Sequence, residues 1–211
     1  ADIIAYPGHV LLSYPLKLTL FRKIKFNLGK FLGLNFFGVY KSFGTKNFFY
    51  PTSNNQIIEN TNKSFKYFNK KLKNLVDLEN FKLKKILIGD LLYDTFLKNQ
   101  YSIKPTINLK SEKFSNFVYD FLTLFEFWYD YLKNNKVKAI IGSHSVYVMG
   151  MTLRIGKINN IENYVLTHEQ LWKINNKQPR QYCEVNNFNK IFKNLSNQNK
   201  SKLIKISKKK N

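Results

Sequence analysis

The chain has 211 residues, 44% of them hydrophobic and 16% aromatic, which is enough to build one folded core and excludes an intrinsically disordered chain. No uninterrupted apolar stretch reaches the roughly 18–20 residues of a membrane span. The formal net charge is +22, and the single cysteine, Cys183, excludes an internal disulfide and a cysteine-based zinc site and fits a reducing cytoplasm.

The first predicted elements are a short strand and a long basic helix. Residues 2–6 are apolar and end in a Pro-Gly-His turn, which predicts a strand. In residues 11–32, every fourth position from Leu16 to Leu32 is a leucine or isoleucine, and basic residues lie between them. This spacing predicts an amphipathic helix. This pattern suits a helix packed on a sheet, and it would also suit a helix lying on a membrane. Gly33 is the expected C-cap, followed by a strand over residues 34–40 (LNFFGVY).

The middle of the chain is expected to contain loops, two helices and one strand. Residues 41–60 are expected to form a long loop, and helical spacing returns over residues 63–76. Residues 84–88 (KKILI) are expected to form a strand that ends at Gly89 and Asp90, before a short helix over residues 91–98.

The longest predicted helix begins after Ser111, a suitable N-cap, and ends near Asn134. Its apolar face is wide and rich in phenylalanine, which predicts burial against both a sheet and a neighbouring helix. We interpret these aromatic residues as core and not as a platform on which bases stack.

Residues 136–167 have the pattern of a βαβ unit in a parallel sheet. An apolar run ends in a Gly-Ser-His-Ser turn, an amphipathic stretch follows, and a second apolar run stops at Thr167 and His168. Polar residues just after such strands face the ligand crevice, and the start of the following helix favours anions. Ser143, His144 and Tyr147 are therefore the first candidates for an active site.

All three histidines lie at the ends of predicted strands, which predicts a crevice lined by His9, Asp90, His144 and His168. Histidine in such a crevice acts as a general base or binds a phosphate or sugar hydroxyl. The alternative for each histidine is a helix cap or a satisfied loop.

For each of three charged residues, two interpretations are open. Asp90 either caps the helix that follows it or acts as a base. Asp94 either binds a partner or faces solvent. Arg154 either clamps a phosphate or forms a salt bridge with a carboxylate that faces the core.

Several chemistries lack their motifs. There is no GxGxxG after a strand, no GxxxxGK[ST] and no GxSxG, so the turns for dinucleotide binding, Walker-type phosphate binding and a hydrolase nucleophile are missing. The histidines show neither HxxxH nor HExxH spacing, so we expect no metal site.

The positive charge comes mostly from lysine, with only three arginines, Arg22, Arg154 and Arg180. Proteins that recognise phosphates or bases favour arginine, because its planar guanidinium forms two parallel hydrogen bonds. We therefore do not expect nucleic acid to be the main partner. Abundant lysine alongside asparagine, isoleucine and phenylalanine is also typical of AT-rich codon usage. Attraction to anionic membrane surfaces or phosphorylated substrates explains the charge equally well.

Two stretches resemble bacterial glycosyltransferase-like proteins of capsule and surface-polysaccharide biosynthesis. IGDLLYDTFLK is similar to their "GD.(I/L)YD..LR" motif, and GSHSVYVMGMTLRIGK is similar to "(V/I)SH.VY....RIA". The resemblance covers about 80 of the 211 residues. The matching positions are Gly89, Asp90, Tyr93, Asp94, Ser143, His144, Tyr147, Arg154 and Ile155.

The resemblance implies a Rossmann-like α/β domain with a parallel sheet flanked by helices, one half of a GT-B enzyme. Residues 1–195 would be the acceptor-side domain, residues 196–211 a basic tail or linker, and the donor domain would be missing. The opening Ala1 is not a natural start either, so we expect an incomplete chain.

The implied activity is sugar transfer from a nucleotide-sugar donor to a glycan or lipid-linked acceptor, with no metal and no other cofactor. Its location would be cytoplasmic, with peripheral contact to the inner face of an anionic membrane. The candidate catalytic residues are Asp90 and His144. The candidate substrate-binding residues are His9, Gly89, Tyr93, Asp94, Ser143, Tyr147, Arg154 and His168.

Two other functions remain open. A non-catalytic basic module would bind nucleic acid or an anionic polymer, with salt-sensitive affinity that does not depend on His144 or Asp90. A different doubly wound protein, such as an epimerase-like one, would be active without a second domain.

Overall fold

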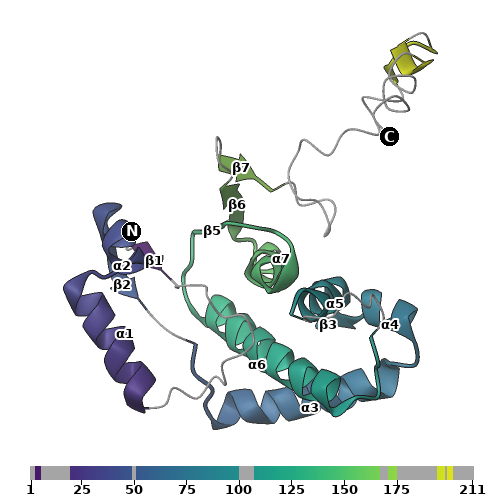
Figure 1. The fold of residues 1–211 in the computed structure, drawn as a ribbon, viewed down its shortest axis with the longest axis horizontal. Helices are drawn as coiled ribbons and strands as arrows, with labels where there is room; N and C mark the ends of the chain where they lie inside the picture. The colour runs from purple at the N-terminus through teal and green to yellow at the C-terminus, as the bar shows by residue number, and fades with distance from the viewer. Residues whose placement is uncertain are drawn as a thin grey trace.

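The computed structural model describes residues 3–5, 20–48, 51–99, 107–166, 171–174, 194–197 and 199–201. The predictions for residues 6–19 and 175–193 lie outside this part. The described chain is a mixed α/β structure dominated by helices (Figure 1). In order, its elements are β1 Ile3–Ala5, α1 Leu20–Leu32, α2 Phe36–Ser42, β2 Thr45–Phe48, α3 Asn55–Lys71, α4 Leu75–Glu79, β3 Lys82–Leu83, β4 Ile86–Leu87, α5 Gly89–Lys98, α6 Glu112–Asn134, β5 Ala139–Gly142, the 3₁₀ helix η1 Tyr147–Met149, α7 Gly150–Ile158, β6 Glu162–Leu166 and β7 Leu171–Lys173.

The predicted βαβ unit is confirmed. β5 and β6 pair in parallel from Ala139 opposite Glu162 to Gly142 opposite Val165, and α7 connects them. β7 adds an antiparallel strand beside β6, so the sheet is mixed.

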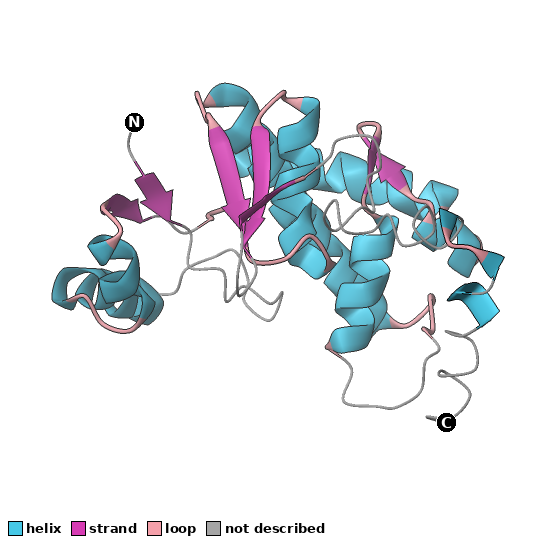
Figure 2. Cartoon of the chain, turned by 90° about the horizontal axis from the view of Figure 1, so that it is seen from above, coloured by secondary structure: helices cyan, strands magenta, loops and turns pink. Residues whose placement is uncertain are grey.

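The extended parallel sheet of a Rossmann-like domain is not seen in the described residues. Their strands form three separate sheets of two, two and three strands, and only β1–β2 and β5–β6 are parallel pairs. Figure 2 shows the β1–β2 pair at one end of the molecule, away from the β5–β6–β7 sheet.

The strand expected over residues 34–40 is wrong, because this stretch is mostly helix α2. Gly33 has the positive φ of 66° expected for a C-cap, and the Leu34 N–H donates to the Gly29 carbonyl at 3.0 Å. The chain therefore turns back sharply, and the Phe37 ring packs so closely on Gly29 that a Cβ there would lie 2.9 Å from it. A short continuous apolar run does not distinguish a buried strand from a helix, and here the tight turn favours the helix.

The strand expected over residues 84–88 is also wrong in its first half. Lys84 and Lys85 form the turn of a tight hairpin between β3 and β4, and both have positive φ, 49° and 66°. Glycine or asparagine usually occupies such positions, so two lysines gave no turn signal.

The expected loop over residues 41–60 contains β2 and the start of α3. Asn54 caps α3 by accepting the Ile57 N–H at 2.8 Å. The helix therefore begins at Asn55, eight residues before its expected start at residue 63. The helix ends at Lys71, and α4 is a separate short helix with a capping box between Asn74 and Asp77. The expected N-cap of α6 is confirmed, because the Phe114 N–H donates to Ser111 Oγ at 3.2 Å.

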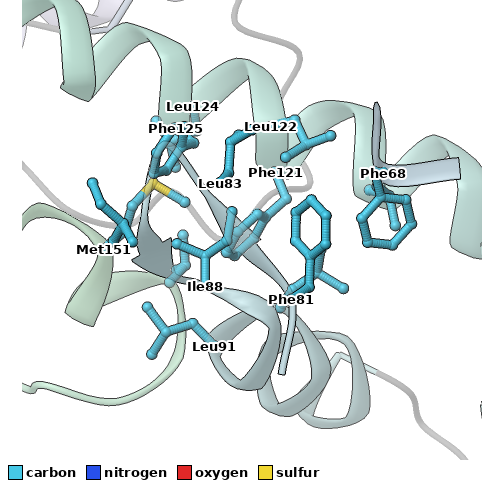
Figure 3. Packing of buried hydrophobic residues seen from close by; sticks show 14 of the residues in the cluster. Phe68, Phe81, Leu83, Ile88, Leu91, Phe121, Leu122, Leu124, Phe125 and Met151 are labelled. Carbon is cyan, nitrogen blue, oxygen red and sulfur yellow. The ribbon is translucent and has the colours of Figure 1, made fainter. Parts of the chain in front are cut away.

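The main core surrounds α6. Phe114, Phe121 and Phe125 of α6 are buried as expected, and Phe117 and Phe127 are partly buried. The extensive contacts of α6 are with the helices α3, α5 and α7, and not with a sheet on one side. Figure 3 shows Phe121 and Phe125 of α6 beside Ile88, Leu91 of α5 and Met151 of α7.

A second, small core lies in the part formed by β1, α1, α2 and β2. Phe37 is its centre, with its ring 5.3 Å from that of Phe26 and 5.0 Å from that of Phe48, both edge-to-face. The apolar stripe of α1 does not pack on a sheet, since Ile24, Leu28 and Leu32 are exposed.

Candidate functional site

Gly89 opens helix α5 where the chain leaves the β3–β4 hairpin. A Cβ at this position would lie 1.7 Å from the Leu78 carbonyl oxygen, and the Gly89 N–H donates to the Phe81 carbonyl at 3.0 Å. No side chain fits this close approach of two backbones. Packing therefore accounts for the glycine without a ligand.

Asp90 does not cap the helix that follows it. The N-cap is Ile88, without a side-chain hydrogen bond, and Asp90 lies in the first turn of α5. A carboxylate there still interacts favourably with the positive end of the helix dipole. The expected cap is therefore corrected to a first-turn acid.

Arg154 of α7 binds Asp90 through two hydrogen bonds. Its Nη1 lies 2.5 Å from Oδ1 and its Nη2 lies 2.9 Å from Oδ2, and Nη1 also donates to the Leu87 carbonyl at 2.7 Å. Only 8% of the Arg154 side chain and 17% of the Asp90 side chain are exposed. The salt bridge predicted as one reading of Arg154 is confirmed, and its guanidinium is committed to this pair.

The pair joins the two sequence motifs. Asp90 belongs to the GDLLYD stretch and Arg154 to the stretch that begins with Ser143 and His144. The same two segments meet again at Gly150, where a Cβ would lie 2.2 Å from the Ser145 carbonyl oxygen and 3.1 Å from the Leu91 side chain. Residues more than 50 positions apart are thus held in one place by charge and by packing.

The turn after β5 presents polar side chains at the surface. Ser143 and His144 are exposed, and Ser143 Oγ lies 3.4 Å from the sulfur of Met149. Tyr147 follows with a φ of 55°, the left-handed region that an aromatic residue seldom adopts. Such conformations persist where the surrounding packing imposes them, and they cluster at functional sites.

Lys98 was missed by the sequence analysis. Its Nζ lies 4.4 Å above the centre of the Tyr147 ring, a cation–π contact between the last turn of α5 and η1. Asp90, Asp94 and Lys98 are spaced by four residues, so all three lie on one face of α5. Helical spacing from Asp90 would have drawn attention to Lys98.

The other predicted site residues divide into two groups. Tyr93 is half-buried and packs against the main core, whereas Asp94 is exposed. His9 and His168 lie outside the described residues, so the predicted crevice is represented here by Asp90 and His144 alone.

The described residues contain no group of three His, Cys, Asp or Glu side chains placed to hold a metal ion. Among the described helices, none is both long and apolar enough to cross a membrane. The chain matches no protein-family model, no curated protein and no solved structure.

Proposed function

We propose that this chain is the acceptor-binding, Rossmann-like part of a GT-B glycosyltransferase that builds a surface polysaccharide. The observation that carries the proposal is the Asp90–Arg154 pair, because it joins the two stretches on which the family resemblance rests. The two stretches were recognised separately in the sequence, and their meeting at one place supports a common role.

In this proposal His144 is the general base. It is exposed at the carboxyl end of a parallel strand, the usual position of ligand-contacting residues in α/β folds. It takes the proton of an acceptor hydroxyl as that oxygen bonds to the anomeric carbon of the donor sugar. The bond from the anomeric carbon to the phosphate oxygen breaks, and the nucleotide diphosphate leaves.

Asp90, the other candidate base, is better suited to positioning. Both of its oxygens accept hydrogen bonds from Arg154, so the carboxylate is held in a fixed place as the structural partner of α7. The pair instead holds α5 against α7. In this proposal Tyr93, Asp94, Ser143 and Tyr147 contact the acceptor. The partners would be a nucleotide sugar and a glycan or lipid-linked acceptor.

The test is a transfer assay on the complete gene product with a panel of nucleotide sugars and a membrane extract as acceptor source. The readout is labelled sugar in the glycan or lipid fraction. We expect transfer with at least one donor and a fall in rate of roughly 100-fold or more for His144→Ala, as for loss of a general base. Asn116→Ala, an exposed position on α6, is the matched control and should keep the rate.

Two results would contradict the proposal at different levels. Absence of transfer from every donor by the folded complete protein would remove the enzyme assignment. Transfer that persists in His144→Ala would keep the enzyme and remove His144 as its base.

A further inference from the structure

Helix α1 turns an apolar stripe toward solvent. Ile24, Leu28, Phe31 and Leu32 are spaced as one face of a helix, and all four are exposed, Phe31 by 82%. The stripe is not what holds α1 to the protein. Phe26 and Gly29, on the other side of the helix, make the contact with Phe37 of α2.

Helix α2 and its flanks add more exposed apolar side chains. Val39, Tyr40 and Phe43 lie within one turn of each other and are exposed, Phe43 by 71%. Leu34, in the turn between the helices, is exposed as well. We call this set the α1–α2 surface: Ile24, Leu28, Phe31, Leu32, Leu34, Val39, Tyr40 and Phe43.

The segment that carries the α1–α2 surface is uniformly basic. Residues 20–48 contain six Lys or Arg residues, and no Asp or Glu occurs from residue 3 to residue 58. Lys41 is exposed and its Nζ donates to the Lys30 carbonyl at 2.5 Å, at the end of α1. Positive charge therefore lies in the same helical hairpin as the exposed aromatic and aliphatic side chains.

These two properties select among the partners that such a surface could meet. A second copy of the chain would bring six further positive charges against the first six, which opposes self-association. A nucleic acid would use the charge but leave Ile24, Leu28 and Leu32 without a role. An anionic bilayer uses both, since its headgroups attract the lysines and its acyl boundary accepts the apolar face.

We propose that the α1–α2 surface docks this protein on an anionic lipid bilayer. α1 lies in the plane of the interface over a length of about 20 Å, as expected for 13 helical residues. Phe31 and Phe43, the most exposed aromatic side chains of the surface, enter the boundary between headgroups and acyl chains. This inference stands on the charge and exposure of the hairpin and does not depend on the sugar-transfer activity.

The test is sedimentation of the protein with vesicles that contain phosphatidylcholine and phosphatidylglycerol in a ratio of about 3:1, in about 0.15 M salt. We expect binding to these vesicles and at least tenfold weaker binding to pure phosphatidylcholine. Phe31→Ser and Phe43→Ser should each weaken binding by roughly tenfold, because each removes an aromatic ring from the interface. Val76→Ser is the matched control, an exposed apolar residue on α4, and should bind as the wild type does.

Heparin binding and light scattering, measured on the same variants, identify the competing partners. The proposal is supported if vesicle binding falls in both Phe variants while heparin binding stays unchanged. The proposal is overturned if the wild type and both Phe variants bind the vesicles equally, or if none of them binds. It is also overturned if the wild type is a dimer and the Phe variants are monomers. Both phenylalanines are exposed, and an unchanged thermal melting curve for each variant excludes misfolding as the cause of a loss.

Discussion

Asp90 and Arg154 show how two charged residues can be buried together at the start of a helix. The carboxylate lies in the first turn of α5, and the guanidinium uses both of its terminal nitrogens on it and on the Leu87 carbonyl. Breaking such a pair leaves the other charge buried without its partner, which is why buried pairs are costly to break. The ion pair therefore fixes α7 to the end of the β3–β4 hairpin.

Asp120, on α6, is a residue for which burial works against the charged form. Burial raises the pKa of its carboxyl above the usual value of 3.8. The folded protein therefore binds this proton more tightly than the unfolded chain does. The contribution of Asp120 to the free energy of unfolding is greatest below pH 3.8 and falls as the pH rises toward the raised value.

We expect Asp120→Asn to stabilise the protein at pH 7, because the amide carries no charge to desolvate. The gain over the wild type should shrink as the pH falls toward 3.8, where the wild-type carboxyl becomes protonated in both states. Urea denaturation at a series of pH values measures this difference. Asp130→Asn, an exposed position on the same helix, is the control. A gain for Asp120→Asn that grows as the pH falls would show that the sign is wrong.

At the scale of elements, the turn of the β3–β4 hairpin is held by a contact with α6, which lies about 40 residues further along the chain. Lys84 reaches Glu126 of α6, with Nζ 2.5 Å from Oε2, while Ser64 Oγ of α3 donates to Oε1 at 2.6 Å. Glu126 is only 1% exposed, so these partners offset the cost of burying its charge. Lys84 also lies 4.0 Å from the centre of the Tyr129 ring.

This contact predicts opposite effects at neighbouring positions of the turn. Lys85→Gly should stabilise the protein by roughly 0.5 kcal/mol, because glycine adopts the positive φ without strain and no contact of the exposed Lys85 is lost. Lys84→Gly should destabilise it by roughly 3 kcal/mol, because the buried carboxylate of Glu126 then loses its charge partner. Urea denaturation of the two variants makes the comparison. Equal effects of the same sign would mean that the turn conformation alone, and not Glu126, decides its stability.

The same elements show what sequence patterns could and could not predict. α6 was predicted almost residue by residue, because its cap and its long apolar periodicity agree. The βαβ unit was predicted because a strand, a turn and a helix each carried their own signal. The strand predictions for residues 34–40 and for the first half of 84–88 were wrong, because both are short runs whose conformation depends on other parts of the chain. A close approach of glycines decides the first, and a distant contact of Lys84 decides the second.

Prediction of the candidate site succeeded only where local signals sufficed. The salt bridge of Arg154 was one of two interpretations. An arginine in a lysine-rich chain indicates a specific contact, but the sequence does not show which residue the arginine contacts. Lys98 was missed because its partner, Tyr147, is brought to it by the fold. Ser143 and His144 were placed at a strand end by the pattern, and the structure has them there.

At the scale of the whole molecule, the described residues have two separate hydrophobic clusters. The large one surrounds α6, and the small one joins Phe37, Phe48 and Phe26. Figure 1 shows α1, α2, β1 and β2 together at one side of α6, and the extensive contacts of these four elements are with each other. Elements that share few buried contacts with the rest of a protein tend to open separately.

We therefore expect Phe37→Ala to loosen this part of the molecule and leave the main core intact. The substitution removes the shared partner of Phe26 and Phe48 and should cost roughly 3 kcal/mol, the usual effect of deleting a buried phenylalanine. Native-state hydrogen exchange should then speed up at least tenfold in α1 and α2 while rates in α6 stay as in the wild type. Phe121→Ala in the large cluster is the complementary variant and should speed exchange in α6. If Phe37→Ala accelerates exchange equally in α2 and α6, the two clusters open as one cooperative unit, and the surface carried by α1 and α2 would then be as rigidly held as the site on α5 and α7.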